Sequence, residues 1–458
     1  MAIETKRSSE FVARLEALPF SSPHWKIAII AALGVLFDST DFALFGSALP
    51  SISKEFGLGP AQAGLLATIG LLGAFFGALF WGTISDYIGR KTAYLTTIMV
   101  FSVFTGLTAL SWDITSLGAF RFIANFGLGG LIPVSNTLVS EFMPSNVRGR
   151  VTSWASSTFP VGLALAAGLS ILFLSNFGWR TLFTIGMFPI LLVLFANRHI
   201  HESVRFLVNK GRLDEAEKVV SQIEVESIGH SQLPDASVLR QASSEPETVK
   251  GLTVADLLSP GYRRITSLLW IVSFCFFWSA NGLLFMLPTI LTQRGIPLSK
   301  AISFAMVQGI FGFLGYVVCG YLIDRIGRRP VLSLYFIIGA AFHLWFAEAS
   351  GVWMYVAVAG VGWVNPGVFG PSTVYACELY PTRMRATAVG WYFGIGRIGS
   401  FLAPTVVGLL LANGYGFYIL HTFALTYLIA GFAVYAIGIE TRGRVLEEIN
   451  RGVVVPAH

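Results

Sequence analysis

The chain has 458 residues, of which 54% are hydrophobic and only 12% are charged. Ordinary soluble domains carry about 25% charged residues, and the mean hydropathy here is +0.68. This composition excludes soluble, disordered and fibrous proteins. The net charge of +6 does not indicate nucleic-acid binding, because the basic residues lie in short groups between apolar runs. The sequence therefore predicts a polytopic membrane protein.

Twelve apolar runs are each long enough for a membrane-spanning helix, which needs about 20 residues. They lie at 27–49, 61–84, 93–111, 115–138, 152–175, 179–198, 264–291, 301–323, 331–348, 352–375, 386–412 and 415–438. A long polar stretch separates the sixth run from the seventh. The predicted fold is an all-α membrane protein with twelve transmembrane helices. Its parts are an N-terminal segment (1–26), a six-helix half (27–198), a central loop (199–262), a second six-helix half (263–438) and a tail (439–458).

The placement of Lys and Arg predicts the orientation of these helices. Of the 31 basic residues, 25 lie in the termini, the central loop and the other loops on the same side. Basic residues accumulate in cytoplasmic loops. We therefore expect both termini and the central loop to be cytoplasmic, in a cell inner (plasma) membrane.

The two predicted halves contain repeated motifs. GTISDYIGRK at 82–91 matches GYLIDRIGRR at 320–329, an offset of 238, and EFMPSNVRGR at 141–150 matches ELYPTRMRAT at 378–387. Two motifs repeated at nearly one offset indicate duplicated halves. Repeats of this kind place a substrate site near the membrane midplane, between the halves.

The repeated Gly-x-x-x-Asp-x-x-Gly-Arg pattern resembles the signature of the major facilitator superfamily, and the resemblance covers essentially the whole chain. It implies two pseudo-symmetric six-helix halves that alternate access to the substrate. Asp86 with Arg90, and Asp324 with Arg328, are expected to pair at helix ends and to latch the cytoplasmic side in one conformation. Simple anchoring of the loops by positive charge would explain the arginines but not the repeated Asp and Gly.

The second repeated motif resembles the Glu-x-x-Pro-x-x-x-Arg pattern found at these places in the superfamily. It contributes Glu141 with Arg148, and Glu378 with Arg385, as further gating residues. The segment 201–217 resembles a segment of sugar porters and organic-ion transporters, and is expected to form one amphipathic cytoplasmic helix.

Ionisable residues inside membrane spans are costly and are functional candidates. Asp41 aligns with an aspartate of proton-coupled sugar porters, and Arg121 with the arginine that partners it there. Making or breaking such a pair would move a proton, because a nearby guanidinium lowers the pKa that burial raises. Asp38 lies one turn earlier and could share this role. The alternatives are a permanent ion pair and transport without proton coupling.

Arg397 lies in the middle of the eleventh run. The surrounding segment, ELYPTRMRATAVGWYFGIGRIGSFLAP, resembles organic-ion transporters and bacterial nicotinate and aromatic-acid transporters. In that group an arginine at this position implies anionic substrates, and a guanidinium can hold a carboxylate through two parallel hydrogen bonds. The alternative is a structural pair with an acid of the first span.

Aromatic and amide side chains in three spans predict a pocket for a small planar ligand. The candidate substrate-binding residues, besides Arg397, are Phe277, Trp278, Asn281, Trp363, Asn365 and Tyr392. The pattern of glutamines by which sugar porters hold hydroxyl groups is absent, with only Asn281 retained, which makes sugars less favoured.

These observations together predict a proton-coupled symporter that imports a small organic anion, most consistent with an aromatic monocarboxylate such as nicotinate or a hydroxybenzoate. The alternatives are a carrier of another metabolite (a non-aromatic acid, a sugar-like compound or a cation), an effluxer, and a membrane sensor without transport. The sequence contains no constellation typical of an enzyme or a metal site. We expect no cofactor other than the proton gradient, no nucleic-acid partner, a lipid bilayer around the helices, and a monomer.

Overall fold

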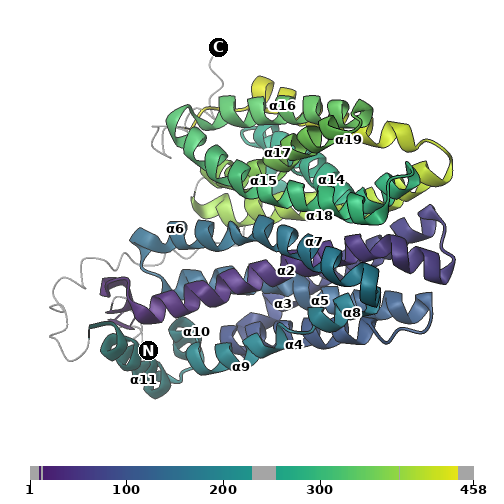
Figure 1. Ribbon diagram of the computed structural model, residues 1–458. Coiled ribbons are helices and arrows are strands. Elements are labelled where there is room, and N and C mark those ends of the chain that lie inside the picture. The colour runs from purple at the N-terminus through teal and green to yellow at the C-terminus, as the bar shows by residue number, and fades with distance from the viewer. Residues whose placement is uncertain (1–9, 12–13, 229–253, 381, 442–458) are drawn as a thin grey trace, which may run out of the picture. The chain divides into compact units, whose positions relative to one another are not determined.

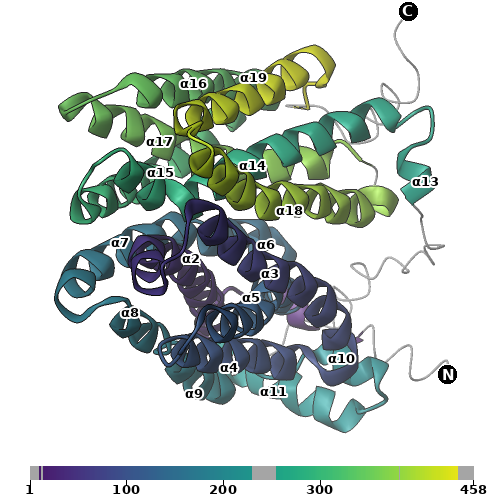
Figure 2. The same ribbon diagram turned by 90° about the vertical axis from the view of Figure 1, so that its right-hand side faces the viewer.

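The computed structural model describes residues 10–11, 14–228, 254–380 and 382–441. In these ranges all regular structure is helical. Figure 1 and Figure 2 show the labelled helices in two views. Eleven helical segments are long and apolar enough to cross a membrane. The prediction of an all-α membrane protein is therefore confirmed. Most of the predicted tail and the middle of the central loop lie outside the described residues.

The helices before the central loop follow the predicted apolar runs. They are α2 (Ser22–Phe56), α3 (Pro60–Ile88), α4 (Arg90–Thr108), α5 (Ile114–Phe142), α6 (Ser145–Ser156), α7 (Thr158–Phe177), α8 (Trp179–Gly186) and α9 (Ile190–His199). The third predicted span corresponds to α4, which is not among the eleven candidate spans. The reason is its composition, because Arg90, Lys91 and several Ser and Thr residues lower its hydropathy.

The central loop and the second half give the remaining helices. These are α10 (Val204–Asn209), α11 (Leu213–Ile228), α13 (Val254–Leu257), α14 (Arg263–Gln293), α15 (Leu298–Arg325), α16 (Arg328–Glu348), α17 (Val352–Glu378), α18 (Thr382–Ala412), the short 3-10 helix η1 (Gly416–Tyr418) and α19 (Ile419–Ile437).

The sixth predicted span, 179–198, is found as the candidate span Trp179–His199, with a turn between α8 and α9 where Pro189 is the N-cap of α9. One sequence expectation about helix continuity is wrong, because the segment 201–217 is not one helix. Gly211 adopts a φ of 73°, a conformation that side chains with a Cβ rarely take, and the chain turns there from α10 into α11.

The described chain divides into two compact units, each with its own core. Unit 1 comprises Met1–Asp38, Leu72–Thr158 and Phe183–Thr248, and unit 2 comprises Ser39–Leu71, Phe159–Leu182 and Val249–His458. The units differ from the two halves inferred from the repeats, because the second part of α2, the first part of α3 and most of α7 belong with the C-terminal helices. The division into halves stays a prediction from the repeats.

Glycine allows very close helix crossings within unit 2. A Cβ on Gly64 of α3 would lie 2.2 Å from the carbonyl oxygen of Pro404 in α18, and one on Gly309 of α15 would lie 2.6 Å from the backbone nitrogen of Ala164. Close to the first crossing, the Thr68 hydroxyl donates to the carbonyl of Phe401 at 2.6 Å. Small residues at such crossings are typical of helix packing in membranes.

Large apolar side chains remain exposed on many helices. Examples are Leu79, Leu172, Leu194 and Phe432, all more than half exposed. A soluble protein rarely leaves so much apolar surface open to water. The exposed side chains are therefore suited to contact lipid, in agreement with the candidate spans.

Candidate functional site

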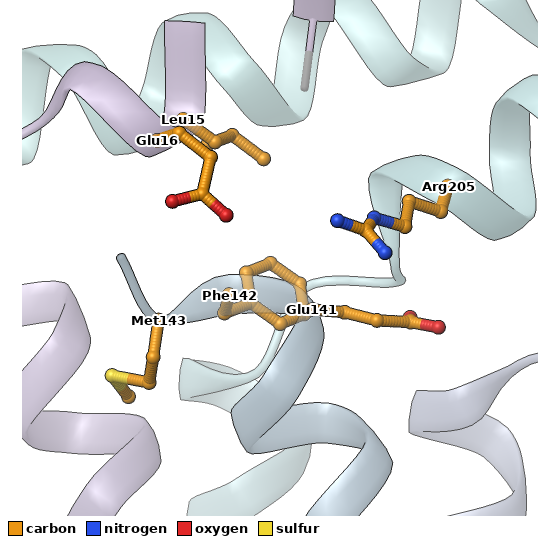
Figure 3. Close-up of a pocket in the computed structure, with 6 residues that line it drawn as sticks. All are labelled: Leu15, Glu16, Glu141, Phe142, Met143 and Arg205. Carbon is orange, nitrogen blue, oxygen red and sulfur yellow. The ribbon is translucent and has the colours of Figure 1, made fainter. Parts of the chain in front are cut away.

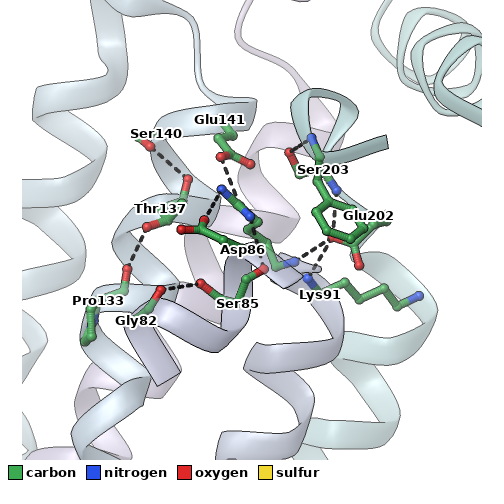
Figure 4. A network of polar contacts seen from close by, with 12 residues as sticks. Gly82, Ser85, Asp86, Lys91, Pro133, Thr137, Ser140, Glu141, Glu202 and Ser203 are labelled. Atoms are coloured by element: carbon green, nitrogen blue, oxygen red, sulfur yellow. Dashed lines mark hydrogen bonds and ion pairs between the residues drawn. The ribbon is translucent and has the colours of Figure 1, made fainter. Parts of the chain in front are cut away.

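The turn between α3 and α4 is held by an acid from a distant part of the chain (Figure 4). Gly89 in this turn has a φ of 99°, and its position as N-cap offers α4 no side-chain partner. Instead, the carboxylate of Glu202 accepts hydrogen bonds from the backbone N–H groups of Arg90 at 2.7 Å and Lys91 at 3.1 Å. A Cβ at Gly89 would lie 2.2 Å from that carboxylate. The backbone conformation therefore favours glycine here, and the absence of a side chain leaves room for the Glu202 carboxylate.

The side chain of Arg90 links three elements of unit 1. Its guanidinium pairs with Asp86 at 2.7 Å and with Glu141 at 3.2 Å, and donates to the carbonyl of Ser85 at 3.0 Å. The ion pair that the sequence predicts between Asp86 and Arg90 is present. We call Asp86, Arg90, Glu141 and Glu202 the first loop network.

A second loop network, Asp324, Arg328, Glu378 and Glu440, repeats this arrangement in unit 2. Arg328 pairs with Asp324 at 3.3 Å and with Glu378 at 3.0 Å. The carboxylate of Glu440 accepts from the backbone N–H groups of Arg328 and Arg329, at 3.0 and 3.1 Å. The duplicated sequence motif therefore folds into a duplicated constellation of charges.

Sequence reasoning did not identify Glu202 and Glu440. A signal was available, because they lie 238 residues apart, the same offset as Asp86 and Asp324, and each is followed by a hydroxyl residue. Extending the repeat comparison to the end of each half would have found them.

The arginines of the second motif bind groups other than their motif acids. Arg148 pairs with Glu16 of the N-terminal segment at 2.7 Å, and Arg385 donates to the carbonyl of Cys377 at 2.9 Å. The spacing suggested Glu141 and Glu378 as their partners, but those acids are engaged by Arg90 and Arg328.

The N-terminal segment is fixed to the central loop. Arg14 binds Glu224 of α11 through two hydrogen bonds, at 2.8 and 2.6 Å, and Glu217 at 2.9 Å. The hydrogen bond with Glu224 raises the pKa of Arg14. Apolar side chains of the same segment, including Leu15, belong to the core of unit 1.

A small pocket lies beside this segment (Figure 3). Its lining residues are Leu15, Glu16, Glu141, Phe142, Met143 and Arg205. One carboxylate oxygen of Glu141 is buried with no hydrogen-bond partner among the described residues. The pocket is too narrow for an organic substrate and belongs to the surroundings of the first loop network.

The charged residues predicted for proton coupling are buried. Asp38, Asp41 and Arg121 are 3%, 2% and 1% exposed. The guanidinium of Arg121 also lies 5.4 Å from the centre of the Phe183 ring, a cation–π distance. Asp38 and Arg121 belong to unit 1 and Asp41 to unit 2, and the pairing of Asp41 with Arg121 stays a prediction.

The parts of α14 and α18 that carry predicted substrate-binding residues are in contact within unit 2. The amide of Asn281 donates to the hydroxyl oxygen of Ser400 at 3.0 Å, and Ser400 lies one turn after Arg397 on α18. Arg397, Phe277, Trp278 and Asn281 are all partly exposed. The rings of Phe274 and Trp278 stack at 5.9 Å, so an aromatic face adjoins the amide. This combination of a cation, an amide and aromatic rings defines the candidate substrate site.

Three other predicted residues are engaged elsewhere in unit 2. Tyr392 is fully buried and its hydroxyl donates to Ser372 at 2.8 Å. Asn365 is buried and accepts from the hydroxyl of Tyr427. The Trp363 indole donates to Tyr335 at 3.2 Å. These side chains pack between helices, and in this structure Tyr392 offers no surface to a ligand.

Among the described residues, no group of three His, Cys, Asp or Glu side chains is placed to hold a metal ion. The described residues provide buried charged residues within the spans, ion pairs at the loops, and the partly exposed aromatic rings of Phe274 and Trp278.

These features define an α-helical integral membrane protein in which a charged loop motif is duplicated. The chain belongs to the Major Facilitator Superfamily, whose family model matches residues 31–404 and 269–450. Members of this superfamily are transporters, and the chain is a transporter rather than an enzyme.

Comparisons with individual proteins agree with this assignment. The chain is 32% identical to the niacin transporter NiaP of Acinetobacter baylyi, over 96% of this chain and 100% of that protein. It is 30% identical to the 4-hydroxybenzoate transporter PcaK of the same organism, over 95% and 94%. A partially occluded inward open structure of the xylose transporter XylE from E. coli has a TM-score of 0.74 at 18% identity, covering 93% of this chain and 100% of that one. The last likeness concerns the fold alone.

Proposed function

We propose that the protein is a proton-coupled symporter that imports a small aromatic monocarboxylate, such as nicotinate or a hydroxybenzoate, by alternating access. The observation that carries the proposal is the partly exposed Arg397 on α18, one turn before Ser400. Ser400 accepts a hydrogen bond from Asn281 of α14, the helix that also carries the stacked rings of Phe274 and Trp278. A guanidinium in an otherwise apolar helix can bind a carboxylate through two hydrogen bonds, and the rings can pack against a planar ligand.

The named relatives support this substrate class. Similar proteins are described as transporters of niacin, of benzoate and of 4-hydroxybenzoate. These compounds share one aromatic ring and one acid group. A shared site for such ligands needs a cation for the acid and an apolar wall for the ring, which are the two elements found on α14 and α18.

Proton coupling is assigned to the buried acids. Asp41 and Asp38 are almost completely buried in α2, and ionisable residues within membrane spans are functional candidates. We infer that Asp41, with Arg121 as its charge partner, takes up and releases the proton during the cycle. The protein acts as a monomer in the inner (plasma) membrane, with both termini on the cytoplasmic side.

The test is uptake of radiolabelled nicotinate and 4-hydroxybenzoate into proteoliposomes, with and without an inward proton gradient. Uptake should be driven by the gradient and lost in Asp41→Asn and in Arg397→Ala. Arg397→Lys keeps the charge without the planar fork and should retain only weak uptake. Arg180→Ala removes an exposed arginine paired with Glu55 and serves as the control.

Each part of the proposal has its own contradicting result. Uptake of aromatic acids that survives Arg397→Ala would refute the carboxylate clamp. Uptake that is independent of the gradient in the unmodified protein would refute symport. Accumulation only when the gradient is reversed would establish an effluxer.

A further inference from the structure

The hydrogen bonds of Asn281 determine which group of its side chain is left for a ligand. Its Nδ2 lies 3.2 Å from the carbonyl oxygen of Phe277 and 3.0 Å from the Oγ of Ser400. A carbonyl oxygen can only accept, so the atom that contacts Phe277 must be the NH2 nitrogen. The orientation of the amide is thereby fixed by its surroundings.

Ser400 fixes the direction of the second hydrogen bond. Its hydroxyl donates to the carbonyl of Gly396 at 3.2 Å, and its single proton is then used. It can therefore only accept from Asn281. Both N–H groups of the Asn281 amide are therefore engaged, one by the carbonyl of Phe277 in α14 and the other by Ser400, whose own proton goes to the backbone of α18.

The carbonyl oxygen Oδ1 of Asn281 remains. It accepts no hydrogen bond from any residue in the described part of the chain, and the side chain is partly exposed beside Trp278. Oδ1 is an acceptor, so a ligand that satisfies it must bring a donor. An unprotonated pyridine nitrogen or a carboxylate is itself an acceptor and would be repelled.

We propose that Asn281 selects substrates with a hydroxyl group on the aromatic ring, its Oδ1 accepting the hydroxyl proton, and that Ser400 acts as the positioning residue that keeps the amide in this orientation. The proposal rests on the proposed function, in which the carboxylate binds Arg397. It adds that, between the two compounds named there, a hydroxybenzoate is preferred over nicotinate or unsubstituted benzoate.

The two polar contacts would then divide the ligand between them. Arg397 would bind the acid group, and Oδ1 of Asn281 would accept a hydrogen bond from the hydroxyl group. A site that hydrogen-bonds a substrate hydroxyl discriminates strongly against an analogue without it, because its own polar group is left unpaired. Since Asn281 is only partly buried, water can satisfy Oδ1 in part, and we expect about a tenfold preference rather than the larger values of closed sites.

The experiment measures initial uptake rates and equilibrium binding for benzoate, nicotinate and the 2-, 3- and 4-hydroxybenzoates with purified protein. In the unmodified protein at least one hydroxybenzoate should exceed benzoate about tenfold in kcat/KM. Asn281→Leu should remove that preference, so that the hydroxybenzoates and benzoate are transported with similar kcat/KM. Asn413→Leu, which removes an exposed amide at the end of α18, is the control and should keep the preference.

Ser400→Ala tests the positioning role. The amide loses the acceptor that orients it, and the ratio of hydroxybenzoate to benzoate affinity should fall several-fold. Residual binding of benzoate shows that each variant is folded. A general packing defect would instead weaken all ligands together, which would contradict the role of Ser400.

The outcomes separate this inference from the proposed function. If benzoate and nicotinate are transported as well as every hydroxybenzoate, or if the preference survives Asn281→Leu, the role of Asn281 is refuted and the symporter stands. If none of the aromatic acids binds or is transported by the unmodified protein, the proposed function fails, and this inference fails with it.

Discussion

Glu202 offers the clearest test of how the loops hold the helices, because it stabilises a helix to which it does not belong. Its carboxylate accepts two backbone N–H bonds at the start of α4, from Arg90 and Lys91. The first turn of a helix has no internal partners for these groups. An N-cap contributes about 1 kcal/mol, and hydrogen bonds to a charged acceptor about 1.5 to 3 kcal/mol. Since Glu202 is partly exposed, we expect Glu202→Ala to destabilise the start of α4 by about 2 kcal/mol.

The assay is amide hydrogen exchange by mass spectrometry on protein in nanodiscs. A loss of about 2 kcal/mol corresponds to about 30-fold faster exchange of the amides at the start of α4. Glu202→Gln keeps an acceptor oxygen without the charge and should show about half the loss in free energy, because neutral hydrogen bonds are weaker. Glu226→Ala breaks an exposed pair with Lys26 and should leave α4 unchanged. Unchanged exchange in Glu202→Ala would refute the capping role.

Three further predictions concern packing, buried charge and pH. Gly64→Leu should destabilise the protein by at least about 1 to 3 kcal/mol, seen as a lower melting temperature, because its Cβ would meet backbone of α18 that cannot give way. Arg14→Ala should leave the nearly buried Glu224 unpaired and increase hydrogen exchange in α11 by about tenfold or more. Arg212→Ala, which breaks an exposed pair, should not increase it. Equal exchange in the two variants would refute the role of the buried charge. Burial lowers the pKa of His201, so the unfolded state takes up a proton more readily than the folded state. The packing of α10 and α11 should therefore weaken as the pH falls below about 6.5. His201→Gln should remove this part of the pH dependence, measured by hydrogen exchange.

The helices were predictable from the sequence because a membrane span leaves a long apolar run. The turns that interrupt the helices were harder to predict from the sequence. The sixth span stays apolar through Met187 and Phe188, so hydropathy alone does not mark the turn between α8 and α9. Gly211 was a visible signal for the break after α10, but helical amphipathicity on both sides suggested one continuous helix.

The site was predictable as a set of residue types, but not as a set of contacts. The sequence indicated Asn281 and Arg397 by their polarity within apolar spans. It could not show that Asn281 donates to Ser400, because that contact depends on how α14 and α18 are rotated about their axes. The same reason explains Tyr392, which lies five residues before Arg397 in the sequence but is fully buried.

The two loop networks are duplicated in sequence but not equal in structure. Arg328 holds Glu378 with two parallel hydrogen bonds, at 3.1 and 3.0 Å, and the hydroxyl of Thr441 donates to the same carboxylate at 2.5 Å. In the first network the residue equivalent to Thr441 is Ser203, whose hydroxyl instead accepts from the backbone at the start of α10. One oxygen of Glu141 is consequently left without a partner among the described residues.

This difference predicts unequal costs for the same substitution. Lysine lacks the planar fork that forms two parallel hydrogen bonds with a carboxylate. Arg328→Lys should therefore lose a contact to Glu378 that Arg90 never makes with Glu141, and should destabilise the protein by about 1 kcal/mol more than Arg90→Lys. Melting temperatures of the two variants in the same detergent measure the difference. Equal losses would mean that the backbone caps from Glu202 and Glu440, and not the guanidinium geometry, determine the stability of both loops.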